Sequence, residues 1–186
     1  MIATLVLAAV VAGPGAYAVD PGRSEAGFDL KATMHTVHGI TRDVRGTVRL
    51  TVESDGALGL QGKITVNAAS LDTDNKRRDA KMHGETLDVA RFPSLVLEPE
   101  RFTPSGPPVA DGPMPGRLIG KLTIRGVTRP VTIDASVTPG AGHAIDVEGR
   151  FDVTWGEFGV PDPSFGFIKI AKVVNARFRA TFVPGS

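Results

Sequence analysis

Hydrophobic residues recur at every second position through most of this chain, and this period of two constrains the fold more than any other feature. In the stretch 44–52, for example, Val44, Val48 and Leu50 alternate with polar or charged neighbours. Successive side chains of a strand point to opposite faces, so the stretch predicts a strand with one apolar and one solvated face. Clean alternation occurs in 26–34, 44–52, 58–66, 131–137, 145–155 and 174–182, and less regular alternation in 95–102 and 117–124. The chain is therefore expected to be all-β, with about eight amphipathic strands.

Strands of this kind must each bury an apolar face, which a closed antiparallel barrel or a sandwich achieves. Most connections are short, which favours pairing between neighbours in the sequence. One short helix is predicted between Asp74 and Leu87, with Thr73 or Asp74 as its N-cap and Gly84 as its end or kink. The proline-rich stretch 103–116 predicts a surface connection between two strands.

The N-terminus resembles a secretory leader, because residues 2–12 are almost wholly apolar and 13–15 are Gly-Pro-Gly. Ala-Tyr-Ala follows, which is a small-x-small cleavage pattern. We predict a signal peptide over residues 1–18, cleaved after Ala18, and a single domain over 19–186. An uncleaved anchor is the alternative, but the apolar run is short for a hydrocarbon layer of about 30 Å. A periplasmic or secreted protein, without stable membrane insertion once the leader is removed, is the expectation.

Charge and cysteine content argue against several classes of function. The formal net charge is +1, from 21 basic and 20 acidic residues, whereas nucleic-acid-binding domains usually carry a strongly basic patch. Nucleic acid is therefore not expected as a partner. The chain has no cysteine, which excludes disulfides, thiolate metal sites and a cysteine nucleophile. Nucleophile-elbow, P-loop and His-Glu-x-x-His motifs are also missing from the sequence, so no catalytic residue and no cofactor is assigned.

Three histidines are the main polar candidates for chemistry. Two residues separate His35 from His38, and His83 lies in the predicted helix. They could converge on a metal in an enzyme that acts on a lipid, although zinc sites usually take three or four ligands. Ordinary surface histidines, or hydrogen-bond donors to a ligand at a rim, are the other interpretations.

The apolar faces of the six clean stretches carry no charged residue, and several of their positions are small. Gly46, Gly62 and Gly149 are inward by alternation. A barrel of about eight strands either is just filled by its side chains or holds one small ligand. Small inward residues favour an open lumen, whereas glycines at bulges or bends of a packed sandwich would explain the same pattern. The alternation by itself does not choose between these two interpretations.

An apolar lumen favours a particular class of guest. Each buried CH₂ group contributes about 0.8 kcal/mol, so a guest with about ten or more binds usefully despite ordering costs. A long prenyl or acyl chain meets that condition, whereas the polar groups of a sugar or nucleotide would lack partners inside. The inward positions chosen as candidate lining residues are Phe28, Leu30, Met34, Val48, Leu50, Ile64, Leu122, Ile133, Phe151, Val153, Trp155 and Phe178.

Several motifs resemble the YceI-like family. The stretch 120–131, Gly-Lys-Leu-Thr-Ile-Arg-Gly-Val-Thr-Arg-Pro-Val, closely resembles the strand–turn–strand signature of that family. So do Ser-Leu-Asp-Thr-Asp-Asn-Lys-Arg-Arg-Asp at 70–79 and Phe-Pro at 92–93. Residues 19–28 are similar to its opening, and 155–160 resemble its late turn, so the likeness extends from about Val19 to Val183.

This resemblance implies an extended, lipocalin-like antiparallel barrel of eight strands with a helix near one end. It also implies a lumen that holds an amphiphile with a long isoprenoid tail, such as a polyprenyl or quinone-type lipid. Family members are typically periplasmic or secreted and sometimes homodimers, and nothing in the resemblance implies catalysis. A non-catalytic carrier of such a lipid is therefore the leading hypothesis, with an enzyme acting on a lipid in the same pocket as the alternative.

Overall fold

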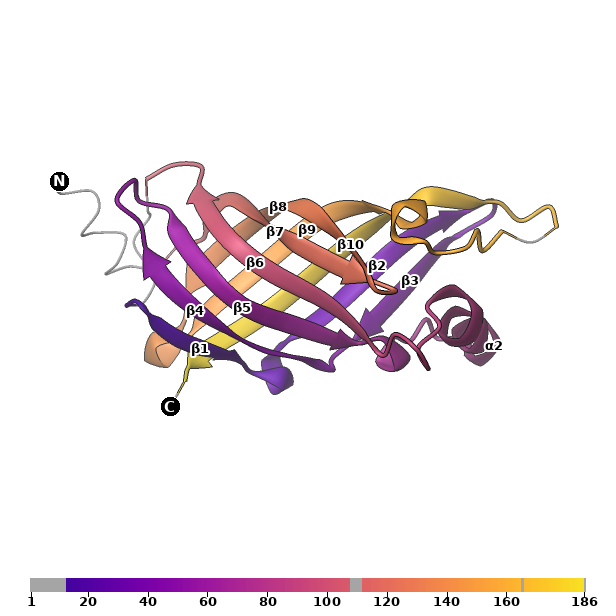
Figure 1. The fold of residues 1–186 in the computed structure, drawn as a ribbon, viewed down its shortest axis with the longest axis horizontal. Coiled ribbons are helices and arrows are strands. Elements are labelled where there is room, and N and C mark those ends of the chain that lie inside the picture. Colours follow the sequence, from indigo (N-terminus) through magenta and orange to yellow (C-terminus); the bar gives the residue numbers. More distant parts are fainter. Residues whose placement is uncertain (1–12, 108–111, 165, 186) are drawn as a thin grey trace.

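Ten antiparallel strands make up most of the described residues, which in this computed structural model are 13–107, 112–164 and 166–185 (Figure 1). The strands are β1 Gly15–Val19, β2 Glu25–Ala32, β3 Thr36–Thr41, β4 Val44–Val52, β5 Leu58–Asn67, β6 Ser94–Pro104, β7 Met114–Ile124, β8 Val127–Pro139, β9 Ile145–Thr154 and β10 Ile170–Pro184. Each of the eight stretches predicted from alternation falls on one of them. β1 and β3 are the two strands that the sequence interpretation did not include.

The sheet closes on itself into a barrel. In the order β1-β4-β5-β6-β7-β8-β9-β10 each strand pairs with the next, and β1 pairs back to β10, with Tyr17 opposite Pro184. β2 and β3 extend the barrel at one end. β2 follows β1 in the chain and pairs with the next part of β10, while β3 precedes β4 in the chain and pairs with β2. The prediction of a closed, eight-stranded, lipocalin-like antiparallel barrel is confirmed.

Two breaks between these strands open one end of the barrel. A 3-10 turn, η1 Pro21–Arg23, separates β1 from β2, and Arg42 and Asp43 separate β3 from β4. β4 and β5 are paired as far as Val44 and Val66. β3, which precedes Val44 in the chain, is not paired with β5 within the described residues. On that side, in the part of the chain that the structure describes, β3 forms a single bridge between Ile40 and Asp72. The segment that joins β5 to β6 lies across this opening, at the right-hand end of Figure 1.

The predicted helix is present in a shorter form. It spans α2 Lys76–Lys81, and its N-cap is Asn75, whose side-chain oxygen accepts a 3.0 Å hydrogen bond from the Arg78 N–H. Thr73 and Asp74, the predicted caps, precede that position, and Asp74 has a positive φ of 61°. A π-helical turn, η3 Met82–Thr86, continues the helix through Gly84. The expected irregularity at Gly84 is therefore a widening of the last turn.

Met34 requires a correction. Alternation placed it on the inner face of a strand over 26–34, but β2 ends at Ala32 and the chain turns back before β3. Because Met34 lies in this turn, the alternation of the strand no longer applies to it, and 83% of its surface is exposed. Met34 therefore does not line the interior.

The core has two parts. The larger cluster lies inside the strands around Phe102 and Ile133, and a smaller one packs Phe158 and Val160 against Leu122 and Val153. β6 ends at Pro104 and β7 begins at Met114, so the proline-rich stretch connects two neighbouring strands as predicted. Within the described ranges, no helix has the length and apolar content required to cross a bilayer.

Candidate functional site

The interior of the barrel holds two adjoining cavities. The wider one, of about 340 Å³, lies at the end where α2 is found, and the narrower one, of about 70 Å³, lies nearer β1. Ile64, Leu97 and Phe178 line both cavities and so form the boundary between them. An apolar cavity of about 150 Å³ already stays dry and admits a benzene-sized guest. The wide cavity therefore has room for a considerably larger apolar body.

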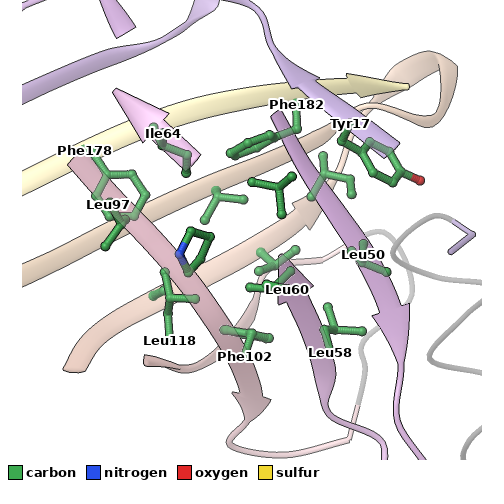
Figure 2. A pocket seen from close by; sticks show the side chains of 16 residues that line it. Tyr17, Leu50, Leu58, Leu60, Ile64, Leu97, Phe102, Leu118, Phe178 and Phe182 are labelled. Carbon is green, nitrogen blue, oxygen red and sulfur yellow. The ribbon is translucent and has the colours of Figure 1, made fainter. Parts of the chain in front are cut away.

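The narrow cavity is surrounded by apolar side chains (Figure 2). Tyr17 is the one lining residue with a polar side-chain group, and its hydroxyl points away from the cavity and donates a 2.8 Å hydrogen bond to the Gly13 carbonyl oxygen. Burial raises the pKa of this hydroxyl, which keeps it neutral. The lining residues are Tyr17, Val48, Leu50, Leu58, Leu60, Ile64, Leu97, Pro99, Phe102, Leu118, Ala135, Val137, Ile145, Val147, Phe178 and Phe182.

The wide cavity is lined along its strands mostly by apolar side chains, with one charged residue each from β2 and β10, and it is polar at the end that holds α2. Phe28, Leu30, Phe151 and Val153 are among the side chains that line it from the strands. Trp155 also lines it, with its indole N–H satisfied by a 2.8 Å hydrogen bond to the Ala171 carbonyl oxygen. The rest of that ring therefore acts as apolar surface. A hydrocarbon chain placed here would meet no unsatisfied polar group on these residues.

Polar residues of the wide cavity come largely from the segment that carries α2. Thr73, Arg78, Lys81 and Thr86 contribute to the lining at this end. The Arg78 Nε donates to the Thr73 hydroxyl at 2.8 Å, and its Nη2 donates to the Thr73 carbonyl oxygen at 2.6 Å. Thr73 is itself fixed by the Asp79 carboxylate, which accepts from its hydroxyl at 2.5 Å and from its N–H at 3.1 Å. The Arg78 guanidinium is thus held in place at the cavity.

The charge of Arg78 is not neutralised by its neighbours. No ion pair to Arg78 is present within the described ranges, because Asp79, next in the chain, bonds to Thr73 instead. A guanidinium held by hydrogen bonds to neutral groups keeps its capacity to bind an anion or a carbonyl oxygen. The sequence interpretation missed this role, since the basic run that begins at Lys76 is more typical of a solvated helix face.

Glycine explains part of the shape of the interior. Gly149 faces inward, but the ring of Phe178 on the neighbouring strand lies over it, so this position is not open lumen. At Gly46 and Gly62, with φ of 152° and 154°, β4 and β5 approach so closely that a side chain would meet the opposite backbone. The interior therefore contains a lumen, as one interpretation held. Its inward glycines, however, lie where a neighbouring ring or backbone comes close, and they do not themselves create the open space.

The structure places ten of the twelve predicted lining residues beside a cavity. Val48 and Leu50 line the narrow cavity, and Ile64 and Phe178 line both. Ile133 is fully buried in the core and faces neither cavity, and Met34 is exposed. The six that line the wide cavity alone are Phe28, Leu30, Leu122, Phe151, Val153 and Trp155.

Several lining residues were missed, and for different reasons. Leu58, Leu60 and Phe182 follow the same alternation and could have been chosen on that signal. Tyr17 was assigned to the leader, so its place in a strand was not considered. Whether any of these residues binds a ligand remains a prediction.

The three histidines do not share a partner. His38 Nδ1 lies 2.7 Å from an Asp29 oxygen, and Arg177 donates to the same oxygen at 2.5 Å. His83 Nε2 lies 2.9 Å from the Leu71 carbonyl oxygen, and His35 is exposed in a turn. Across the residues that the structure describes, no group of three or more His, Cys, Asp or Glu could hold a metal ion.

Comparison with protein families identifies one match over nearly the whole described chain. The model of the YceI-like domain matches residues 17–182. Curated relatives include a UPF0312 protein of Yersinia pestis, 30% identical over 103 residues, which are 52% of this chain and 50% of that protein. A UPF0312 protein of Pseudomonas aeruginosa is 32% identical over 104 residues, 53% of this chain and 51% of that protein. The matched region thus spans about half the length of these relatives.

Solved structures share the fold at low sequence identity. BcnA of Burkholderia cenocepacia has a TM-score of 0.70 and 18% identity, covering 88% of this chain and 98% of that chain. A polyisoprenoid-binding domain from Saccharophagus degradans, implicated in plant cell wall breakdown, has a TM-score of 0.71 and 12% identity, covering 91% and 98%. A YceI protein of Campylobacter jejuni has a TM-score of 0.59 and 15% identity, covering 83% and 88%.

Proposed function

We propose that this protein, which belongs to the YceI-like family, binds and carries an amphiphilic lipid with a long isoprenoid tail inside its barrel. The observation that carries the proposal is the pair of adjoining apolar cavities, one of about 340 Å³ and one of about 70 Å³. Ten buried CH₂ groups in such an interior contribute about 8 kcal/mol before ordering costs. The polyisoprenoid-binding domain with the same fold supports an isoprenoid rather than another apolar chain.

The orientation of the guest follows from where the polar groups lie. Arg78 and Thr73 line the wide cavity at the end where α2 covers the opening, whereas the narrow cavity is enclosed by apolar side chains. The tail therefore extends from the wide cavity past Phe178 toward the narrow one, and the head group stays near Arg78. An anionic or carbonyl-bearing head group suits the fixed guanidinium.

The protein acts as a carrier and not as an enzyme in this proposal, and it works in the periplasm or outside the cell after its leader is removed. The alternative, an enzyme acting on the same lipid, requires reacting groups beside the guest. Most side chains that line the wide cavity from its strands are apolar packing surface, with Glu25 and Arg177 as the charged exceptions.

Organic extraction of the exported protein, followed by mass spectrometry, tests the proposal directly. We expect one prenyl-type lipid per protein molecule. A176F places a ring in the wide cavity and should abolish uptake, whereas T132F, at an exposed position of β8, should not. Protein that is empty after export, or equal uptake by both variants, would contradict the proposal. Metal-dependent turnover of the lipid would favour the enzyme.

The head-group assignment has its own test. R78Q removes the cation while leaving the apolar lining intact, so it should weaken binding of a prenyl phosphate by roughly tenfold and of a prenyl alcohol by much less. K76Q removes one charge from an exposed position of the same helix and serves as the matched control. An equal loss of affinity for the prenyl phosphate and the prenyl alcohol in R78Q would mean that Arg78 does not contact the head group.

A further inference from the structure

Exposed apolar side chains gather on two loops at the end of the barrel that holds the wide cavity. Met34, in the turn between β2 and β3, is 83% exposed. Phe167 and Ile168, in the connection that leads into β10, are 81% and 39% exposed. Exposing large apolar side chains to water costs free energy, and a cluster of them on a surface often marks an interaction site.

The two loops are joined to each other. The Thr33 N–H donates to the Lys169 carbonyl oxygen at 3.0 Å, and the Lys169 N–H donates to the Thr33 hydroxyl at 2.7 Å. Met34 follows Thr33, and Phe167 and Ile168 precede Lys169, so the three apolar side chains belong to one tip of the molecule. In Figure 1 the connection before β10 projects beyond the strands at this end.

Three lysines lie in or next to the same two loops. Lys31, Lys169 and Lys172 are exposed, and none of the three forms an ion pair within the ranges that the structure describes. Asp162 is the one acidic residue in the turn between β2 and β3 and in the stretch 159–169 taken together. Its pKa is lowered first by hydrogen bonds from Ser164 and then by the positive charges of Lys169 and Lys172. The tip as a whole is cationic.

The same segments also form the wall of the wide cavity. Leu30 of β2 lines this cavity, and so do Pro163 and Ile170, which flank the projecting connection. A surface against the tip would therefore lie next to the wall of the cavity. A lipid leaving such a surface would have only a short path through water.

We propose that Lys31, Met34, Phe167, Ile168, Lys169 and Lys172 form a docking tip that seats the open end of the barrel on an anionic lipid bilayer. Apolar side chains on a tip enter the region between head groups and acyl chains, while the lysines face the anionic head groups. A protein partner would not require the tip to adjoin a cavity that accepts a hydrocarbon chain. This inference rests on the proposed function, because docking matters for exchange of a lipid held inside.

Vesicle flotation of the full, exported chain tests the docking. The probes are vesicles of phosphatidylcholine alone and of phosphatidylcholine with one third phosphatidylglycerol. The unmodified protein should float with the anionic vesicles and much less with the neutral ones. F167S/I168S and K169Q/K172Q should each lower the partition coefficient onto anionic vesicles by roughly tenfold or more.

Matched controls separate the tip from general surface effects. I119S removes an apolar side chain that is 41% exposed on β7, and K63Q/K121Q makes the same change in net charge away from the tip. Both should bind within about twofold of the unmodified protein, since neither touches the tip. Equal binding by tip and control variants would overturn the inference, as would equal binding to neutral vesicles. Loss of a dimer in F167S/I168S with unchanged flotation would assign the tip to a second copy of the chain and overturn it also.

Lipid content, measured on the same samples, distinguishes the two proposals. A variant that retains its extracted lipid but no longer floats supports the docking tip and leaves the carrier function in place. Protein that floats but never holds a lipid contradicts the proposed function and not the docking. Unmodified protein that holds lipid but fails to float contradicts the docking alone.

Discussion

At the scale of single residues, aromatic rings and glycines on neighbouring strands are paired inside this barrel. The rings of Phe28 and Phe178 lie over Gly39 and Gly149, directly across from them in the strand register. A ring over a glycine fills the space of the missing side chain and fixes the orientation of the aromatic residue. Alternation predicted which way these residues point, because it depends only on the strand geometry. It could not predict which inward residues cover a glycine or, like Ile133, become fully buried, because that depends on the facing strand.

The pair formed by Gly149 and Phe178 leads to a prediction on stability. A Cβ at position 149 would come within 2.9 Å of Ile133 and closer still to the Phe178 ring, and both side chains belong to the core. G149A should therefore lower the free energy of unfolding by about 1–3 kcal/mol, as overpacking usually does. Urea denaturation measures this, with G156A as the control, since a Cβ at Gly156 meets nothing within 4 Å. Equal midpoints for the two variants would contradict the prediction.

The charge group on β2 and β10 predicts a pH dependence. Burial by itself would raise the pKa of the Asp29 carboxyl, but hydrogen bonds from His38 and Arg177 outweigh it and hold the pKa below its usual value. A carboxyl with a lowered pKa in the folded state stabilises the fold above its unfolded pKa of 3.8, and this contribution is lost as the pH falls through the folded value. Because the Asp29 side chain is 36% exposed, solvent screening limits the contribution to about 1 kcal/mol or less.

D29N tests this pH dependence. The variant should be slightly less stable than the unmodified protein at neutral pH, and the difference should disappear as the pH is lowered below about 4. Urea denaturation across that pH range gives both curves. A difference that persists unchanged well below the unfolded pKa of 3.8 would contradict the assignment.

At the scale of elements, β1 and β3 show where sequence interpretation stops. The stretch Ala-Tyr-Ala at 16–18 fits a cleavage pattern and also forms most of β1. This short pattern does not by itself distinguish a cleavage site from a strand. In the structure Tyr17 is buried and β1 pairs with both β4 and β10, so the predicted cleavage point lies within β1. β3 is short and alternates Val37 and Gly39 with polar or exposed neighbours, which is a weak signal. The longer strands contain enough alternating apolar and polar residues for the pattern to be recognised.

The position of β1 predicts a cost for losing it. A chain that begins at Val19 lacks the strand that joins β4 to β10 and exposes the surface that Tyr17 covers, so it should be less stable by about 2 kcal/mol or more than one beginning at Gly13. Urea denaturation of the two chains measures the difference. N-terminal sequencing of the exported protein then shows which of the two is made in the cell. Equal stability would mean that β1 contributes nothing to closure.

At the scale of the whole molecule, alternation predicted eight amphipathic strands in a barrel or a sandwich, because each apolar face needs a partner. The resemblance to the YceI-like family favoured the closed barrel, and neither signal indicated the unequal widths of its interior. The opening at one end arises from the breaks at η1 and between β3 and β4, and these depend on a few residues whose effect is visible only in the assembled sheet. The position of Arg78 at that opening likewise depends on how the helix segment packs, and no pattern in its own sequence indicates it.

The difference in width predicts a limit on the length of the guest. Ala135 lines the narrow cavity, so A135L reduces its volume while the wide cavity is unchanged. Short prenyl alcohols should bind as before, and the longest chain accepted should become shorter. Competition binding with alcohols of increasing length measures this, and A176F, which fills the wide cavity, should instead weaken all of them. An equal effect of A135L on every length would show that the narrow cavity is not occupied.

The boundary formed by Ile64, Leu97 and Phe178 also has a consequence for selectivity. The ring of Phe178 lies over Gly149 at this boundary. A flexible tail can thread through it one unit at a time, whereas a rigid fused-ring molecule of the same total carbon content would be stopped in the first chamber. The barrel would then sort lipids by their stiffness as much as by their size.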